Sequence, residues 1–296
     1  MQDRFAAVAR ELTALSGLRC AAAPERRVAG ASAGECYAWS CDAGALFVKL
    51  APSTALAMLE AEAAGLLELG KAGAVRVPRV RASGQTEAAA FLALEWIDAG
   101  HADEACERRL GEGLAALHAV TAPRFGWVRD NTIGRTPQAN GWCDDWLEFF
   151  RERRLRPQLT LAAHNGFAGL LAAPGERLLA SLPRLLRGHA PAAALLHGDL
   201  WGGNWLATAE GEPVIFDPAV YYGDGETDLA MTRLFGGFGE AFYRAYEAAS
   251  PRTPGAGLRG ELYNLYHVLN HANLFGGGYA RQARAIMERL LAQGRG

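Results

Sequence analysis

Short stretches in which hydrophobic and polar residues alternate dominate the first third of the chain, and turn-forming residues separate them. They predict strands at Cys36–Ser40, Ala45–Leu50, Arg79–Ala82 and Ala90–Leu94. The Asp-x-Gly sequence at Asp42–Gly44 predicts a hairpin turn between the first two strands. Leucines recur on one side of Leu56–Lys71 at helical spacing, which predicts a helix with Ser53 or Thr54 as its cap.

From about Asp98 onward the hydrophobic spacing becomes helical. Helices are predicted at Asp103–Val120, Trp142–Arg154, Glu176–Arg187, Gly239–Ala249, Glu261–Leu274 and Ala280–Leu291. Strands return only at Ala194–His197, Trp205–Ala207 and Pro213–Phe216. The pattern predicts an α+β fold with a small β-rich lobe over residues 1–97, a larger helical lobe over residues 98–296, and a hinge at about 95–99.

Composition and charge narrow the class of protein. The 296 residues are 50% hydrophobic and 21% charged, which is ordinary for a globular protein with a sizeable core. A net charge of −2 without a basic excess argues against nucleic acid as a partner. No apolar run reaches the roughly 18 residues of a membrane span, so we expect no membrane segment. The oligomeric state is left open.

The N-terminal segment and the cysteines indicate a cytoplasmic protein. Met1–Gly17 mixes charged residues with apolar ones, unlike a secretory signal peptide. The cysteines are odd in number and irregularly spaced: Cys20, Cys36, Cys41, Cys106 and Cys143. We therefore expect reduced thiols in the cytoplasm and no disulfide framework.

Three glycine-rich stretches match short functional motifs but lack the structural context that each motif needs. Gly65–Lys71 has the spacing of a phosphate-binding P-loop, yet it falls within a predicted helix. Gly255–Gly260 spells the dinucleotide fingerprint, yet it follows a turn where a strand is required. Gly30–Gly34 matches the nucleophile elbow of esterases, but a predicted strand follows it where the elbow requires a helix. We set these interpretations aside.

The strongest chemical signal is the string His197-Gly-Asp199-Leu-Trp-Gly-Gly-Asn204, followed by Phe216-Asp217. An Asp, an Asn five residues later and a second Asp are typical of eukaryotic-type kinases. Phosphoryl transfer needs a carboxylate to accept the proton of the attacking hydroxyl, and Asp199 fits this role. Asn204 and Asp217 supply the oxygen ligands that Mg²⁺ prefers.

The upstream lobe contains the groups expected of a nucleotide site. Lys49 ends an apolar strand, where a kinase lysine contacts the phosphates, and Lys71 is the only other lysine. Glu60 and Glu62 on the following helix are both candidate partners for Lys49, and Glu62 is favoured because it precedes the apolar stripe.

Two further segments complete the predicted nucleotide site. The turn that contains Gly30, Ser32 and Gly34 is expected to cover the phosphates with backbone N–H groups. The segment Glu95-Trp96-Ile97, which follows a predicted strand, is expected to form the hinge whose backbone contacts adenine.

Longer strings around these residues resemble the fructosamine kinase (ketosamine-3-kinase) family. They are His197–Asn204, Phe216–Ala219, Tyr222–Asp224, Asp228–Thr232, Leu234–Phe238 and Leu265–Gly277, with Phe125–Trp127, Asn131–Gly134, Pro137–Asn140 and Trp146–Phe150 upstream. The match runs over nearly the whole chain. Aminoglycoside and choline kinases share the Asp, Asn and Asp pattern but not these flanking strings.

The resemblance implies the protein-kinase-like fold of aminoglycoside phosphotransferases and a kinase that uses ATP and Mg²⁺. Family members phosphorylate the O3 hydroxyl of ketoamines, the Amadori products of sugars with amines, which leads to deglycation. By this resemblance Asp199 accepts the proton, Asn204 and Asp217 bind Mg²⁺, and Lys49 with Glu62 positions the phosphates. The implied partner is a small-molecule ketoamine or a glycated amine.

The resemblance departs at Gly225, where many members have an arginine. The neighbouring acidic cluster of Asp224, Glu226 and Asp228 either holds a helix start or contacts substrate, since acidic residues favour helix N-termini. Trp201 either forms a wall against the sugar or packs beneath the loop that contains Asp199.

Two alternatives stay open at this stage. One is a kinase of the same fold that acts on another hydroxyl acceptor, such as an aminoglycoside or an amino alcohol. The other is a non-catalytic nucleotide-binding protein. The family-specific strings argue against the first, and the intact Lys49, Asp199, Asn204 and Asp217 argue against the second.

Overall fold

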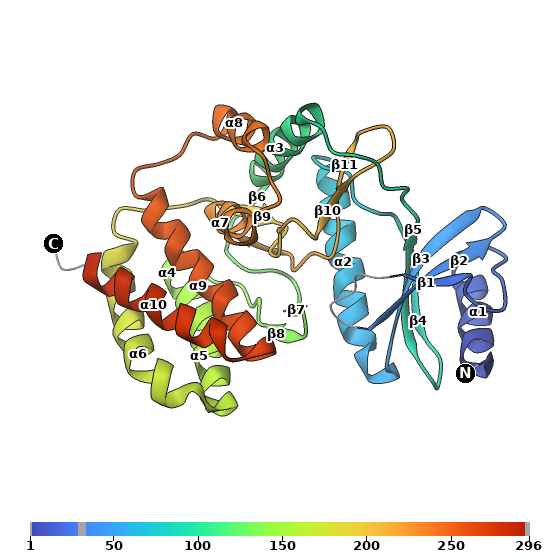
Figure 1. The fold of residues 1–296 in the computed structure, drawn as a ribbon, viewed down its shortest axis with the longest axis horizontal. Coiled ribbons are helices and arrows are strands. Elements are labelled where there is room, and N and C mark those ends of the chain that lie inside the picture. Colours follow the sequence, from blue (N-terminus) through green and yellow to red (C-terminus); the bar gives the residue numbers. More distant parts are fainter. Residues whose placement is uncertain (1, 29–33, 294–296) are drawn as a thin grey trace.

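The computed structural model describes residues 2–28 and 34–293, which form two lobes (Figure 1). The N-terminal lobe contains a five-stranded antiparallel sheet in the order β1-β2-β3-β5-β4. Its strands are β1 (Arg26–Val28), β2 (Glu35–Cys41), β3 (Gly44–Ala51), β4 (Val80–Gln85) and β5 (Ala90–Glu95). The predicted α+β class is confirmed.

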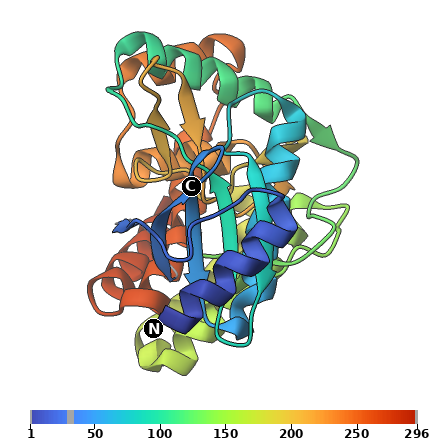
Figure 2. The ribbon, with the colours of Figure 1, turned by 90° about the vertical axis from the view of Figure 1, so that its right-hand side faces the viewer.

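Helices cover both faces of this sheet. Helix α1 (Gln2–Ser16) lies across the outer face (Figure 2), and α2 (Leu56–Ala72) lies between the sheet and the second lobe (Figure 1). Phe91 of β5 is buried in a cluster with α1, and Leu92 is buried in a cluster with α2. Successive side chains of a strand point to opposite faces, so β5 can be apolar throughout.

The four strands and the helix predicted for this lobe are present, with ends shifted by a few residues. The predicted cap is wrong: Ser53–Ala55 form a 3₁₀ turn, and Ala55 precedes α2 without a side-chain cap. Helix α1 and strand β1 were not predicted. The hydrophobic spacing of α1 is interrupted by charged residues, because between residues 3 and 16 only Val8, Ala9 and Leu12 are buried.

The C-terminal lobe is mainly helical and packs around one large buried cluster. Its helices are α3 (Glu104–His118), α4 (Trp146–Phe149), α5 (Arg156–Ala162), α6 (Ala168–Leu185), α7 (Glu226–Phe235), α8 (Glu240–Ala249), α9 (Ala256–Phe275) and α10 (Gly278–Gln293). A π-helical turn at 150–155 connects α4 to α5, and the chain kinks between α5 and α6 at Gly166, which has a non-helical φ of 88°. Among the residues described, no helix has the length and apolarity needed to cross a membrane.

Short strands place the candidate site between these helices. They are β6 (Thr121–Ala122), β7 (Asn131–Ile133), β8 (Thr136–Gln138), β9 (Ala193–Leu196), β10 (Trp205–Ala207), β11 (Pro213–Ile215) and β12 (Tyr221–Gly223). β9 lies between β12 and β6, while β7–β8 and β10–β11 are hairpins. The predicted strands correspond to β9, β10 and β11. The other strands were not predicted, because strands of two or three residues carry little periodicity. Helices α5 and α7 were also not predicted.

The structure contradicts the expectation that all cysteines are reduced. Cys20 and Cys41 form a disulfide that links the segment after α1 to the end of β2. Cys36, Cys106 and Cys143 are free thiols. Sequence spacing does not reveal the pair, because the two residues become neighbours only when the chain after α1 returns to the edge of β2.

We expect alkylation of denatured, unreduced protein to modify only Cys36, Cys106 and Cys143, and prior reduction to expose all five thiols. A disulfide across a separation of 21 residues should stabilise the fold by about 3 kcal/mol through the lost freedom of the unfolded chain. Reduction should lower the free energy of unfolding by that amount, as measured by urea unfolding. Five reactive thiols before reduction would contradict the pairing.

Candidate active site

The catalytic loop, which we define as residues 197–204, connects β9 to β10. The Asn204 side chain turns back into this loop, where Nδ2 donates to the carbonyl oxygen of Asp199 at 2.8 Å and lies 3.4 Å from Asp199 Oδ2. Gly198 has a φ of 83°, and a Cβ there would lie 2.1 Å from the carbonyl oxygen of Ala219. Only glycine fits this turn, which sets the direction of Asp199.

Lys49 joins three segments that lie far apart in the sequence. Its Nζ donates to Glu62 Oε1 at 2.6 Å and to the carboxylate of Asp217. Burial lowers the pKa of Lys49, but the nearby charges of Glu62 and Asp217 outweigh burial and hold it above its ordinary value. Lys49 is therefore a buried cation, 5% exposed, and Glu62 rather than Glu60 is its partner from α2.

Asp217 has a backbone conformation that non-glycine residues rarely adopt. Its φ is 56°, and among the described residues it is the one non-glycine residue with a positive φ. Strained backbone of this kind persists where the surroundings hold it, and it is concentrated at functional sites. The strand β11 before it and the ion pair with Lys49 are the features that hold Asp217 in this conformation.

Asp199, Asn204 and Asp217 provide the donor set expected of a magnesium site. Because Asn204 Nδ2 faces the backbone of Asp199, its Oδ1 points to the other side of the amide. An amide oxygen together with a carboxylate forms a hard oxygen donor set that suits Mg²⁺. The residues present therefore fit the ion predicted from the sequence.

A small cavity of about 50 Å³ brings the predicted groups together. It is lined by Lys49, Glu62, Asp199 and Asp217, and also by residues of the β7–β8 hairpin, Asn131, Thr132 and Gly134. Burial, followed by the negative charges of Asp217 and Asp228, raises the pKa of Asp199 to about 7. A carboxyl with this pKa is suited to proton transfer near neutral pH. The hairpin was not predicted as part of the site.

A larger cavity of about 430 Å³ lies beside the first and also reaches Asp217. The predicted hinge residues Glu95, Trp96 and Ile97 line it, together with apolar side chains that include Phe47 and Leu94. Its volume is within the range of small-molecule pockets. The guanidinium of Arg26 lies 5.3 Å from the centre of the Trp96 ring and covers one side of the pocket.

One residue of the predicted phosphate-covering turn is described. Gly34 has a φ of 120°, and a Cβ there would lie 2.4 Å from the carbonyl oxygen of Leu50, so this position requires glycine. Gly30 and Ser32 lie outside the described residues. Gly34 directly precedes β2, which pairs with the strand that contains Lys49.

Asp228 acts on the catalytic loop, although the sequence grouped it with a neighbouring acidic cluster. Its carboxylate accepts backbone N–H bonds from His197 at 2.7 Å and from Gly198 at 2.9 Å. His118 lies 3.3 Å from the same carboxylate, and Asp228 is 1% exposed. Asp228 therefore anchors the start of the loop that presents Asp199. The signal in the sequence is an acid in the first turn of a helix, which does not identify its partners.

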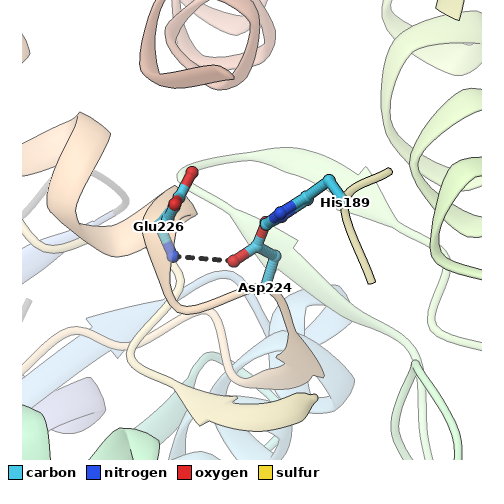
Figure 3. A group of neighbouring side chains, drawn as sticks. All are labelled: His189, Asp224 and Glu226. Carbon is cyan, nitrogen blue, oxygen red and sulfur yellow. Dashed lines mark hydrogen bonds and ion pairs between the residues drawn. The ribbon is translucent and has the colours of Figure 1, made fainter. Parts of the chain in front are cut away.

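Asp224 and Glu226 belong to a separate network with His189 (Figure 3). His189 Nε2 lies 2.5 Å from Asp224 Oδ2, which also accepts from the Tyr263 hydroxyl at 2.6 Å. Both carboxylate oxygens of Glu226 accept hydrogen bonds from Arg259 at 2.7 Å. The carboxylates already have hydrogen-bonding partners, so these contacts favour a structural network over a metal site.

This network lies away from the catalytic loop. Asp224, Glu226 and His189 line a different cavity of about 510 Å³, and none of the described residues that line the cavity at Asp199 lines this one. The structure therefore does not bring Asp224 and Glu226 to Asp199. A Cβ at Gly225 would lie 2.9 Å from His118 Nδ1, so a larger residue there requires His118 to shift.

Trp201 lies on the open side of the catalytic loop. It is 40% exposed, its ring lies over Gly203, and its edge faces Phe235 with the ring centres 6.3 Å apart. A Cβ at residue 203 would lie 2.3 Å from the indole, so Gly203 makes room for the ring. Of the two predicted arrangements, the exposed wall describes this position better than packing beneath the loop.

Comparison with known proteins identifies relatives whose names point to one family. The fructosamine kinase family model matches residues 4–293. The chain is 48% identical to a probable ketoamine kinase of Synechocystis, over 83% of this chain and 82% of that protein. It is 41% identical to a chloroplastic protein-ribulosamine 3-kinase of Arabidopsis thaliana, over 84% of this chain and 77% of that protein.

Solved structures of similar proteins include a member of the same family and a protein that shares the fold. A putative fructosamine-3-kinase from Thermobifida fusca is 33% identical with a TM-score of 0.85, covering 97% of this chain and 98% of that one. The two-lobed kinase-like fold is shared by an aminoglycoside phosphotransferase that is 14% identical, with a TM-score of 0.61. The match covers 98% of this chain and 99% of the phosphotransferase chain. The family match over almost the full length shows that this chain belongs to the fructosamine kinase family.

Proposed function

We propose that this chain is an ATP-dependent kinase that phosphorylates the O3 hydroxyl of ketoamines of the fructosamine or ribulosamine type. The observation that carries the proposal is the position of Lys49, which Glu62 and Asp217 hold in one cavity with Asp199. The names of the relatives, ketoamine kinase and ribulosamine 3-kinase, support the acceptor class. The similar aminoglycoside phosphotransferase was solved with ADP, which supports the nucleotide.

The proposed mechanism assigns one task to each group. Lys49 and the turn at Gly34 bind the phosphates, and the backbone of residues 95–97 contacts adenine. Asn204 and Asp217 hold Mg²⁺, which when bound offsets negative charge on the phosphate oxygens. Asp199 accepts the O3 proton as O3 bonds to the γ-phosphorus, while the bond from that phosphorus to its bridging oxygen breaks and ADP leaves.

The product explains how phosphorylation leads to deglycation. Its phosphate is on C3, next to the C2 carbonyl, and enolisation of the ketoamine toward C1 allows the phosphate to leave. Hydrolysis of the resulting unsaturated intermediate then releases the free amine. No further group on this chain is needed for these steps.

The boundaries of the two lobes and the cellular location of the protein also form part of the proposal. We assign residues 1–97 to nucleotide binding, residues 98–296 to catalysis and acceptor binding, and the hinge to about 95–99. The hydrogen bond from Gly100 N to the Ala207 carbonyl supports this division, because it joins the end of the hinge to the hairpin beside the catalytic loop. A cytoplasmic location is supported by the proposed use of ATP, whereas the Cys20–Cys41 disulfide argues against it.

The test measures ADP release from Mg²⁺-ATP with ribulose, erythrulose and fructose adducts of one small amine. We expect ADP release with at least one ketoamine, phosphate on O3 by NMR, and loss of turnover when EDTA removes the metal. Kanamycin and choline serve as competing acceptors. Turnover only with those acceptors would identify a different kinase, and nucleotide binding without turnover of any acceptor would identify a binding protein.

A further inference from the structure

Exposed aromatic side chains gather beside the catalytic loop. Seven large hydrophobic side chains are exposed among the described residues, and three of them, Trp201, Phe235 and Phe275, belong to one group. His271 joins this group with its ring centre 4.7 Å from Phe235 and 5.5 Å from Phe275. Tyr279 completes it, 5.2 Å from His271. We call these five residues the aromatic strip.

The aromatic strip begins at the catalytic loop. Trp201 follows Asp199 by two residues and meets Phe235 at the end of α7. The backbone after Phe235 packs directly on the loop, since a Cβ at Gly202 would lie 2.9 Å from both Gly236 O and Gly237 Cα. One end of the strip is therefore fixed against the proposed acceptor site.

The other end lies beside the hairpin that lines the catalytic cavity. Phe275 ends α9 and Tyr279 lies in the first turn of α10, and the connection between these helices lies next to β7–β8 (Figure 1). A Cβ at Gly134 of the hairpin would lie 3.3 Å from Leu274 Cδ1. Because Gly134 lines the same cavity as Asp199, this end of the strip also lies beside a segment that lines that cavity.

The strip is uncharged as well as apolar. Burial lowers the pKa of His271 below its ordinary value, so the imidazole is neutral at pH 7. The neighbouring His267 is 4% exposed, and burial lowers its pKa to about 3. Exposed apolar patches of this kind next to a cavity mark sites that bind ligands or proteins.

A ketoamine has two chemically different parts. The sugar is polar and contains O3, whereas the amine contributes whatever group is attached to nitrogen. A polar sugar does not account for an apolar wall that continues past Trp201 to Phe275, 65% exposed. A hydrocarbon or aromatic group on nitrogen would bury these ring faces, and ring faces also attract the cationic form of the amine.

We propose that the aromatic strip is the subsite for the amine portion of the ketoamine, and that it selects amines whose nitrogen carries a hydrocarbon or aromatic group. This inference rests on the proposed function, since it assumes that O3 lies at Asp199. It identifies Phe275 as a specificity-determining residue, because this side chain lies at the end of the strip away from Trp201 and is the most exposed of those named.

The test compares adducts of one sugar with methylamine, 2-phenylethylamine and taurine. We expect kcat/KM for the phenylethyl adduct to exceed that for the methyl adduct by about tenfold, the upper range for an aromatic contact, and the taurine adduct to rank last. Phe275→Ala should bring the phenylethyl-to-methyl ratio toward one through KM for the ketoamine, with KM for ATP unchanged. Phe275→Leu should keep an intermediate ratio.

Leu15→Ala is the matched control, because Leu15 is a half-exposed apolar side chain on α1, at the far end of the other lobe (Figure 1). It should leave the ratio unchanged. Equal kcat/KM for the three adducts, with the methyl adduct turned over, would overturn the inference alone. Failure of every adduct would overturn the proposed function and the inference with it. A Phe275→Ala variant that loses self-association in sedimentation, with its ratio intact, would show the strip to be a protein interface and would also overturn the inference.

Discussion

Replacing Asp199 by Asn should lower kcat for ketoamine phosphorylation by about 10²- to 10⁴-fold, the range expected for loss of a general base. Asparagine has nearly the same shape as aspartate, and its amide cannot accept the proton of the acceptor hydroxyl. The surroundings raise the pKa of Asp199 to about 7, mainly through burial and then through the charges of Asp217 and Asp228. The native carboxylate is therefore a stronger base than an exposed one.

The measurement is ADP release under saturating Mg²⁺-ATP, with nucleotide affinity determined separately by calorimetry. ATP affinity should stay close to that of the native protein, because Lys49 and the pocket at residues 95–97 are untouched. Asp144→Asn is a matched control, since the side chain of Asp144 is 82% exposed and Arg124 is its one ion-pair partner among the described residues. A kcat of Asp199→Asn within tenfold of the native value would show that Asp199 is not the base.

Replacing Asp228 by Ala should remove both stability and activity. The carboxylate accepts the backbone N–H groups of His197 and Gly198, and Ala leaves both buried donors without partners. An unsatisfied buried donor costs about 1–3 kcal/mol, so the free energy of unfolding should fall by on the order of 3 kcal/mol. Because Asp199 follows these two residues, a small shift of the loop should lower kcat by about 10²-fold.

Denaturant unfolding gives the stability change, and turnover below the melting temperature of the variant gives the catalytic change. Asp228→Asn keeps one acceptor oxygen, so both losses should be smaller than with Ala. A fully stable Asp228→Ala protein with native kcat would show that the loop holds its conformation without this anchor.

The pH dependence of stability distinguishes the charged hydrogen bonds of Asp228 from a packing effect of its side chain. Burial raises the pKa of Asp228, but hydrogen bonds and charges, with His118 first among them, outweigh it and hold the pKa below its ordinary value. A lowered pKa adds stability that is present above the unfolded value of about 3.9 and is lost as the pH falls further. This acid-dependent loss should be weaker in Asp228→Asn, which has no carboxyl group to protonate.

Local sequence was sufficient for the parts of the site that lie close together along the chain. Asp199 and Asn204 lie on one loop, and Asp217 directly follows the β10–β11 hairpin after it, so their spacing along the chain already indicates that they are neighbours. The choice of Glu62 over Glu60 also follows from local pattern, because one face of α2 is buried against the sheet. These expectations agree with the contacts that the structure shows.

Spacing along the chain was insufficient where the partners of a residue come from distant segments. The acids at positions 224, 226 and 228 look alike in sequence, yet Asp228 anchors the catalytic loop while Glu226 pairs with Arg259 on α9. The disulfide of Cys20 was missed for the same reason, because its partner Cys41 lies at the end of β2, where the segment after α1 pairs with that strand, and sequence spacing does not identify this pairing.

The sequence by itself determined the α+β class, most elements of both lobes and the group of residues that resembles a kinase site. These features depend on hydrophobic periodicity and motif spacing, which involve residues that lie close together along the chain. Only the tertiary structure decided that Lys49 meets Asp217 across 168 positions, that Asp228 anchors the catalytic loop, and that Phe235 and Phe275 continue the wall begun by Trp201. These contacts depend on how the lobes and helices pack, and packing joins surfaces whose partners the local pattern does not specify.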